Sequence, residues 1–434
     1  MQKIKNIFLK KKILVYGLGK SGLSTYNFLK KKSEVYLFDD KKISVNKHEL
    51  KKKILKISEL KKKIFDYIIL SPGINIKKCK LSSFVIKNFD KIFTDLDVFY
   101  SSFNNKKITI TGTNGKSTTA KILHDILKDQ KFDVRLVGNI GNPVLLEKNI
   151  KKNTIFVIEA SSYQLDYSKI FRSDYSAILN ISPDHLERHG NLKNYVKAKF
   201  KLIKNQKKTD VAFLNKKDSN LIKLIKNNRI LSKIIHVDKI IDKKLFEKID
   251  NNYFATHGNQ QNLSFIFQIV KKLNLNKNET LRTLNKFNGL NYRQQIIFNK
   301  GKLIIINDSK STSFSSSISF LKSAKNIFWI MGGIPKIGDK FILTKKNCKN
   351  FYAYIYGKNK KKFIRAIKNK IYFKSFKDLK TAVNKVFLDI KSIKNEEVKV
   401  IFFSPSAASF DSFKNFEERG EYFNRLIEKK VNGK

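Results

Sequence analysis

The sequence has only two cysteines in 434 residues, Cys79 and Cys348. They lie far apart without Cys-x-x-Cys spacing, which argues against a disulfide framework and a thiolate metal site. No apolar run reaches 18 residues, and the start, MQKIKNIFLKKKILVYGLG, has no apolar stretch long enough for a signal peptide. We therefore expect a cytoplasmic protein without stable membrane insertion.

Acidic residues are few: 36 Asp and Glu stand against 90 Lys and Arg, a formal net charge of +54. Such a charge is typical of proteins that bind nucleic acid. The lysines, however, occur in short runs along the whole chain, beside an excess of Ile, Asn and Phe, and these four amino acids share A/T-rich codons. No recognition-helix motif or aromatic stacking platform accompanies them. We predict no nucleic-acid partner, and a nucleotide-regulated nucleic-acid binder stays the alternative outside enzymes.

Apolar, often β-branched runs alternate with helical patterns along the chain. The runs span residues 13–17, 34–38, 67–71, 108–112, 154–160, 176–182, 302–308, 326–333 and 398–405. Continuous apolar runs are typical of parallel strands covered on both faces, which predicts an α/β fold. Ligand-type turns at Gly17, Gly112 and Asn307 predict three domains, at 1–95, 96–289 and 290–434.

The first glycine-rich turn reads VYGLGKSGLS and matches G-x-G-x-x-G at Gly17, Gly19 and Gly22. Asp39 and Asp40 end the next apolar run. Glycines in such a turn let the backbone approach a pyrophosphate, and an acid one strand later can reach a ribose hydroxyl. The pattern indicates a nucleotide diphosphate, with a ligand-free tight turn as the alternative.

The second turn, ITITGTNGKSTTAKIL at 108–123, is a shortened phosphate loop. A full P-loop has a glycine where this chain has Ile110. The backbone N–H groups of 112–117 and the following helix start can still face phosphate oxygens. Lys116 can reach the terminal phosphates, and Ser117 can bind Mg²⁺.

Three further residues are candidates for metal binding. Glu159 ends the apolar run TIFVIEA, and a carboxylate there resembles the metal-holding acid of phosphate-loop enzymes. A surface acid is the alternative. His185 follows another apolar run, and Lys199 lies on a predicted helix. Without a family argument, both could be ordinary surface residues.

The stretches GTNGKST, IEASSYQL and NISPDHLERHG occur in an order and spacing that resemble the Mur ligase family. These enzymes form amide bonds with ATP in peptidoglycan precursor synthesis. The resemblance runs from residue 13 to residue 425 and is closest to members that add D-glutamate, as NDSKSTS, MGGIPKIGDKF and FFSPSAASFDSFKNFEERGEYF indicate. The Asp-Asn-Pro-Arg of diaminopimelate-adding relatives does not occur in the last domain. A ligase for another amino acid is the alternative among enzymes.

The resemblance implies an N-terminal Rossmann-like domain that binds a UDP-sugar, a central P-loop-type ATPase domain with a parallel sheet, and a C-terminal Rossmann-like domain. It also implies one substrate for each of three sets of candidate residues. The UDP-substrate, UDP-N-acetylmuramoyl-L-alanine, would contact Gly19, Lys20, Ser21, Asp39, Asp40, Ser71, Pro72, Gly73 and Asn139. ATP would contact Gly112, Thr113, Asn114, Gly115, Lys116, Ser117, Thr118, Asn262, Arg293 and Asp308. D-glutamate would contact Lys310, Thr312, Lys336, Ser409, Phe410 and Phe416.

Two Mg²⁺ ions are implied as well. Ser117 and Glu159 would hold one ion, and His185 with a carbamylated Lys199 would hold the other. Lys116 would join Glu159, His185 and Lys199 as a catalytic residue. The protein is expected to be a monomer.

The chain departs from the family pattern at five positions: Gly258, Tyr292, Ile334, Pro335 and Ala407. The changes at Gly258 and Tyr292 leave open which residues would contact adenine. The reaction class does not depend on any of them.

Overall fold

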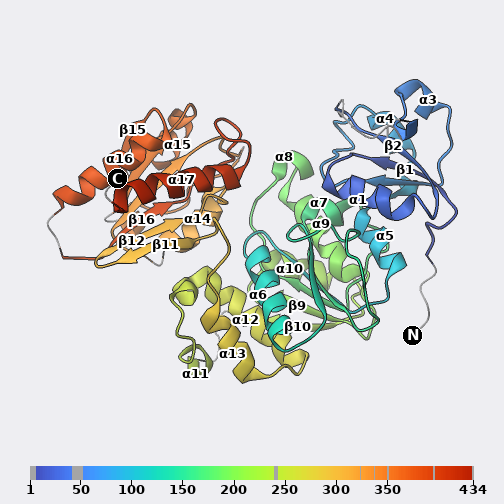
Figure 1. Ribbon diagram of the computed structural model, residues 1–434, viewed down its shortest axis with the longest axis horizontal. Coiled ribbons are helices and arrows are strands. Elements are labelled where there is room, and N and C mark those ends of the chain that lie inside the picture. The colour runs from blue at the N-terminus through green and yellow to red at the C-terminus, as the bar shows by residue number, and fades with distance from the viewer. Residues whose placement is uncertain are drawn as a thin grey trace. The chain divides into compact units, whose positions relative to one another are not determined.

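The computed structural model describes residues 6–41, 52–238, 243–322, 324–336, 338–348, 351–393 and 396–432. They form three β-sheets, each built from its own stretch of chain and flanked by helices (Figure 1). The predicted α/β class is confirmed. Within these ranges, no helix is both long and apolar enough to cross a bilayer.

The first sheet is parallel throughout, in the order β2-β1-β3-β4. Its strands are β1 (Lys12–Tyr16), β2 (Glu34–Phe38), β3 (Tyr67–Leu70) and β4 (Ile92–Phe93). The helices are α1 (Lys20–Leu29), α3 (Ile57–Lys61), α4 (Ser82–Lys87), the 3-10 helix η1 (Phe89–Lys91) and α5 (Asp95–Ser102). Parallel pairing puts the carboxyl ends of β1, β2 and β3 at one edge, where ligands of open α/β sheets bind.

The second sheet has six parallel strands in the order β10-β9-β8-β5-β7-β6. The strands are β5 (Lys107–Thr111), β6 (Val134–Gly138), β7 (Ile155–Glu159), β8 (Tyr175–Ile178), β9 (Val211–Asn215) and β10 (Lys233–Val237). Every residue of β5 and β7 is buried, as continuous apolar runs predict for central strands.

Between β5 and β11 (Gln295–Lys300), the chain also forms the following helices. They are α6 (Lys116–Asp129), α7 (Ser162–Tyr167), α8 (Leu186–His189), α9 (Leu192–Lys204), α10 (Ser219–Lys226), α11 (Lys243–Phe246), η2 (Asn252–Ala255), α12 (His257–Lys272) and α13 (Lys277–Lys286). The end of α6 is tied to α13, because Thr283 Oγ1 donates to Asp129 Oδ2 at 2.7 Å.

The third sheet is mixed, in the order β11-β12-β16-β13-β14-β15. Its strands are β11 (Gln295–Lys300), β12 (Leu303–Asn307), β13 (Ile327–Gly332), β14 (Phe351–Tyr356), β15 (Tyr372–Phe376) and β16 (Lys399–Phe403). Its helices are α14 (Phe314–Leu321), η3 (Lys346–Cys348), α15 (Lys360–Ile367), α16 (Leu379–Ser392) and α17 (Phe416–Val431). Strand β11 runs antiparallel at one edge, in a hairpin with β12 that turns at Gly301, and the other described pairings in this sheet are parallel.

Contacts group the chain into two compact units. The first comprises Met1–Ile181, Arg188–Ile241 and Asn262–Thr283, and the second comprises Ser182–Glu187, Asp242–Gln261 and Leu284–Lys434. Asp97 of α5 helps to join the first two sheets, because its Oδ1 accepts from Ser168 Oγ at 2.8 Å and from the backbone N–H groups of 169–171. The boundaries at 95/96 and 289/290 stay predictions.

Candidate active site

The phosphate loop joins β5 to α6 at the carboxyl edge of the second sheet. Gly112 and Gly115 both have positive φ, +151° and +84°. A Cβ on Gly115 would lie 2.1 Å from Oδ1 of Asn262, so only glycine lets this asparagine approach the loop. The structure therefore brings Asn262, a predicted ATP contact, against the start of α6.

Asn180, which the sequence analysis did not single out, holds the loop from the segment just after β8. Its carbonyl accepts from the N–H of Thr113 at 2.9 Å, its Oδ1 accepts from the N–H of Asn114 at 2.9 Å, and its amide donates to the Asn114 carbonyl at 3.1 Å. Two of the N–H groups expected to face phosphate are thus used within the protein. The N-terminal turn of α6 is the part of the loop that stays suited to phosphate, and Lys116 Nζ donates there to the Thr113 carbonyl at 2.8 Å.

Ser117, Glu159 and Asn139 meet at the same edge. Glu159 is 1% exposed, and its two carboxylate oxygens accept from Ser117 Oγ at 2.6 Å and from Asn139 Nδ2 at 2.7 Å. Hydroxyl and carboxylate oxygens are the ligands that Mg²⁺ prefers, so this donor set fits the predicted metal. No group of three His, Cys, Asp or Glu side chains suited to a metal occurs in the part of the chain that the structure describes.

Lys199 lies on the buried face of α9 and is 1% exposed. Its Nζ donates to the Gly112 carbonyl at 2.8 Å and lies 3.4 Å from Thr111 Oγ1 and 4.7 Å from the centre of the Tyr195 ring. Lys199 is therefore not one of the many solvated surface lysines, and it touches the phosphate loop directly.

Two more residues that the sequence analysis missed support this region. The Tyr195 hydroxyl lies 3.0 Å from Thr113 Oγ1, and the buried His189 places Nε2 3.0 Å from Ser162 Oγ at the start of α7. The His189 ring also packs against Tyr195. One turn of helix separates Tyr195 from Lys199, and this spacing on an apolar helix face was the available signal.

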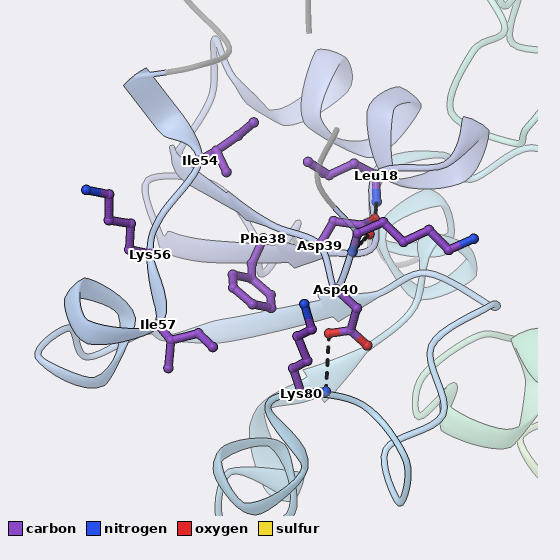
Figure 2. Close-up of a pocket in the computed structure, with 9 residues that line it drawn as sticks. Leu18, Phe38, Asp39, Asp40, Ile54, Lys56, Ile57 and Lys80 are labelled. Atoms are coloured by element: carbon purple, nitrogen blue, oxygen red, sulfur yellow. Dashed lines mark hydrogen bonds between the residues drawn. The ribbon is translucent and has the colours of Figure 1, made fainter. Parts of the chain in front are cut away.

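A cavity of about 450 Å³ opens at the carboxyl edge of the first sheet. It is lined by Leu18, Phe38, Asp39, Asp40, Lys41, Ile54, Lys56, Ile57 and Lys80, and Figure 2 shows most of these side chains around it. Asp39 and Asp40 are predicted contacts of the UDP-substrate. The other predicted contacts, Gly19, Lys20, Ser21, the 71–73 segment and Asn139, do not line this cavity.

Both acids of the cavity accept hydrogen bonds from the backbone. Asp39 accepts from the N–H of Leu18 at 2.6 Å, which ties the glycine-rich turn to the end of β2, and Asp40 accepts from the N–H of Lys80 at 3.2 Å (Figure 2). The Tyr16 hydroxyl also donates to Asp40, at 2.5 Å. Both carboxylates are therefore fixed before any ligand arrives.

The three glycines of this turn have different roles. A Cβ on Gly17 would lie 2.8 Å from Ser71 Cβ, and one on Gly22 would lie 1.8 Å from the Gly17 carbonyl oxygen. On Gly19, by contrast, a Cβ would meet no described heavy atom within 4 Å. Gly17 and Gly22 are thus required by packing, whereas Gly19 leaves open the space that a pyrophosphate would need.

In the second unit, Asp308 is buried where β12 ends. It accepts from Ser404 Oγ at 2.8 Å and from the N–H of Gln294 at 3.2 Å. Burial raises the pKa of Asp308 to about 7, although these bonds and the charges of Arg293 and Arg419 act against the rise. Of the predicted ATP contacts, Arg293 and Asp308 therefore influence each other within this unit.

The predicted D-glutamate contacts lie in the loops that follow β12, β13 and β16 and at the start of α17. Lys310 Nζ lies 3.8 Å from the centre of the Phe416 ring, and Lys336 forms an ion pair with Asp184. Ser409 is buried, whereas Phe410 is 72% exposed. Because β12, β13 and β16 are parallel neighbours, these loops share one sheet edge.

His185 belongs to a short stretch of the second unit, 182–187, and has a positive φ of +54°. Its N–H donates to Asp184 Oδ1 at 3.0 Å, and its Nδ1 lies 3.6 Å from Glu187 Oε1. Glu159 and Lys199 belong to the first unit. The predicted pairing of His185 with Lys199 therefore stays a prediction.

Tyr292, one of the departures from the family pattern, is packed tightly. Its φ is +62°, and a Cβ on Gly420 would lie 2.3 Å from its ring, so the tyrosine fits because position 420 is glycine. Ile334 forms a two-residue antiparallel bridge with Ala408.

Comparison with known proteins places these features in a family. Residues 110–292 match the model of the Mur ligase middle domain, and residues 11–92 match the Mur ligase MurD-like N-terminal domain. The UDP-N-acetylmuramoylalanine–D-glutamate ligase of Rickettsia felis is 35% identical over 444 residues, covering 97% of this chain and 98% of the relative. The ligase of the same name from Francisella philomiragia is 33% identical over 371 residues, covering 84% of this chain and 86% of the relative.

Solved structures agree at the level of the fold. MurF from Acinetobacter baumannii matches with a TM-score of 0.60 at 14% identity over 95% of this chain and 93% of its own. The MurF ligase of Thermotoga maritima, solved in complex with ADP, matches with a TM-score of 0.57 at 15% identity over 99% of this chain and 98% of its own. On the relatives of 33–35% identity and the two matching domain models, the chain belongs to the Mur ligase family.

Proposed function

We propose that this chain adds D-glutamate to UDP-N-acetylmuramoyl-L-alanine with consumption of ATP, in the cytoplasmic synthesis of peptidoglycan precursors. Relatives that carry the name of this ligase are 33–35% identical over most of the chain. The observation that carries the chemistry is the contact of 2.6 Å between Ser117 and Glu159 beside the phosphate loop. We infer a monomer, with domains at 1–95, 96–289 and 290–434.

The reaction needs activation, because a carboxylate and an ammonium ion do not condense in water unaided. In the proposed mechanism, an oxygen of the L-alanyl carboxylate attacks the γ-phosphorus of ATP, which gives an acyl phosphate and ADP. The amine of D-glutamate, after loss of its proton, attacks the acyl carbon. The tetrahedral intermediate then expels inorganic phosphate and leaves the new amide.

The phosphate loop serves the first step by placement and charge. The start of α6 and Lys116 bind the phosphates of ATP, with Asn262 beside the loop, so the reacting oxygen and phosphorus are held in line. Ser117 and Glu159 would hold one Mg²⁺, and His185 with the carbamate of Lys199 would hold the second. Bound Mg²⁺ supplies positive charge that offsets the repulsion between carboxylate and γ-phosphate.

The carbamate of Lys199 is supported by burial. Carbamate formation needs the neutral amine, and removal from water disfavours the charged ammonium. Lys199 is 1% exposed, and its Nζ donates to the Gly112 carbonyl at 2.8 Å and lies 3.4 Å from Thr111 Oγ1. The modification would replace a cation by oxygen ligands suited to Mg²⁺.

The second unit would deliver the amino acid. Lys310, Thr312, Lys336, Ser409, Phe410 and Phe416 are proposed to receive D-glutamate, while Arg293 and Asp308 contact ATP. Lysine ammonium groups suit the two carboxylates of glutamate. At the other end, the cavity beside Asp39 and Asp40, with Gly19, Lys20, Ser21 and the 71–73 segment, is proposed to receive the uridine diphosphate.

Amino-acid specificity tests the proposal. Phosphate release from ATP is measured with UDP-N-acetylmuramoyl-L-alanine and, in separate reactions, D-glutamate, L-glutamate and L-lysine. We expect release only with D-glutamate. Release with L-lysine alone would identify a Mur ligase of different specificity, and no release with any of them would contradict the proposal.

A further inference from the structure

Arg419, in the second turn of α17, is 1% exposed although its side chain carries a full charge. Arginine is seldom fully buried unless its donors are used. Here Nε donates to Ser309 Oγ at 3.1 Å, and Nη2 donates to the carbonyls of Ser309 at 2.7 Å and Ala407 at 3.0 Å, whereas the buried Nη1 has no hydrogen-bond partner among the described residues. One guanidinium therefore joins α17 to the loops after β12 and β16.

These loops are the ones that carry the proposed amino-acid contacts. Ser309 immediately precedes Lys310 in the loop after β12, and Ala407 lies two residues before Ser409 in the loop after β16. The link extends to the start of α17, because Ser309 Oγ donates to the Phe416 carbonyl at 2.8 Å.

The loop after β13, which carries Lys336, packs against the same guanidinium. A Cβ on Gly333 would lie 3.1 Å from Nη1 of Arg419, so this glycine lets the loop approach it. The bridge between Ile334 and Ala408 adds two backbone hydrogen bonds, of 2.9 Å and 3.0 Å, between the loops after β13 and β16. All four segments with proposed D-glutamate contacts thus meet at Arg419.

The planar shape of the Arg419 guanidinium lets it contact several loops at once. The planar fork of arginine can donate to two carbonyls and a hydroxyl at once, whereas lysine has a single nitrogen. Burial lowers the pKa of Arg419, while Tyr356, Asp411 and Asp308 favour its charged form. An apolar replacement would leave the carbonyls of Ser309 and Ala407 buried without this donor.

We propose that Arg419 is a positioning residue for amino-acid addition, which sets the loops after β12, β13 and β16 and the start of α17 in the arrangement that receives the incoming amino acid. The inference rests on the proposed D-glutamate contacts. It assigns no contact between Arg419 and the substrate.

Steady-state kinetics of four variants tests this. Arg419→Lys keeps the charge and loses the fork, and Ser309→Ala removes the hydroxyl that relays the contact to Phe416. Arg425→Lys makes the same change at an exposed position of α17 and is the matched control. Lys336→Ala probes the proposed pocket directly. The KM values for D-glutamate, ATP and UDP-N-acetylmuramoyl-L-alanine are measured separately, together with the melting temperature.

We expect Arg419→Lys to raise the KM for D-glutamate about tenfold to a hundredfold, as displaced binding groups do, with the other two KM values within about twofold. Ser309→Ala should raise the same KM by a smaller factor, and Arg425→Lys should leave all three unchanged. If Arg419→Lys fails to fold, Ser309→Ala decides: an unchanged KM for D-glutamate overturns the proposal. Equal rises in all three KM values would assign Arg419 a purely structural role.

Lys336→Ala separates two kinds of failure. If Lys336→Ala raises the KM for D-glutamate and Arg419→Lys does not, the proposed D-glutamate contacts are supported and the positioning role of Arg419 is wrong. If Lys336→Ala leaves that KM unchanged while the wild type turns over D-glutamate, the pocket assignment fails and the inference falls with it.

Discussion

Replacing Asn139 by alanine should weaken Mg²⁺ binding. The family resemblance implies that Asn139 lies along the substrate, which stays a prediction, and in the structure its side-chain amide donates to Glu159 Oε1 at 2.7 Å. The other carboxylate oxygen accepts from Ser117 at 2.6 Å. Asn139 therefore orients the carboxylate that we propose as a metal ligand, and removing its amide lets that carboxylate rotate.

The magnitude follows from the bond that is lost. A hydrogen bond to a charged group contributes about 1.5–3 kcal/mol, and each ~1.4 kcal/mol is tenfold in an equilibrium constant. Asn139→Ala should thus raise the Mg²⁺ concentration for half-maximal activity about tenfold to a hundredfold, the range seen when an outer partner of a metal ligand is removed.

The assay follows ADP release at fixed ATP while free Mg²⁺ is varied, and it is paired with the shift in melting temperature that Mg²⁺ causes. Asn142→Ala is the matched control, because Asn142 donates to Glu147 Oε1 at 2.8 Å on the exposed side of the same loop. The control should titrate like the wild type. If Asn139→Ala behaves like the control towards Mg²⁺ and raises only the KM for the UDP-substrate, the reasoning is refuted.

Three further predictions concern other parts of the site. Gly19→Ala should leave the melting temperature unchanged and raise the KM for the UDP-substrate. Gly22→Ala should lower the melting temperature, because its Cβ would lie 1.8 Å from the Gly17 carbonyl oxygen. Equal destabilisation of both variants would contradict this difference. Burial raises the pKa of Asp308 from 3.8 to about 7, so between these values the folded protein keeps a proton that the unfolded chain has lost, and this group's contribution to stability falls as the pH rises. The melting temperature of Asp308→Asn relative to wild type should accordingly rise between about pH 4 and about pH 7, and a constant difference would be evidence against the shifted pKa. Lys199→Ala should abolish turnover in the ADP-release assay, and full activity would remove the carbamate from the mechanism.

Much of the site could be predicted because it follows from parallel strands. Glu159 ends one apolar run, Ser117 follows the turn after another, and parallel neighbours bring the carboxyl ends of these two strands to one edge. In the structure, Ser117 Oγ contacts the Glu159 carboxylate, as two ligands of one Mg²⁺ ion would. Asp39 and Asp40 lie at a cavity for the same reason.

The missed residues act through contacts between distant segments. Asn180 holds the phosphate loop from the segment just after β8, and Arg419 reaches the loop at Ser309 from α17. Asparagine and arginine are common surface residues, so no local pattern distinguishes these two. The antiparallel strand β11 was also missed, because QIIFNK is no continuous apolar run and none of its residues is fully buried in its hairpin with β12.

Isotope transfer tests the acyl phosphate, on which the account depends, most directly. UDP-N-acetylmuramoyl-L-alanine labelled with ¹⁸O in the alanyl carboxylate is incubated with ATP, Mg²⁺, D-glutamate and the protein, and the released phosphate is analysed by mass spectrometry. The account predicts one carboxylate-derived oxygen in each phosphate, with one amide formed for each ADP. Phosphate without label, released while the amide forms, would contradict it.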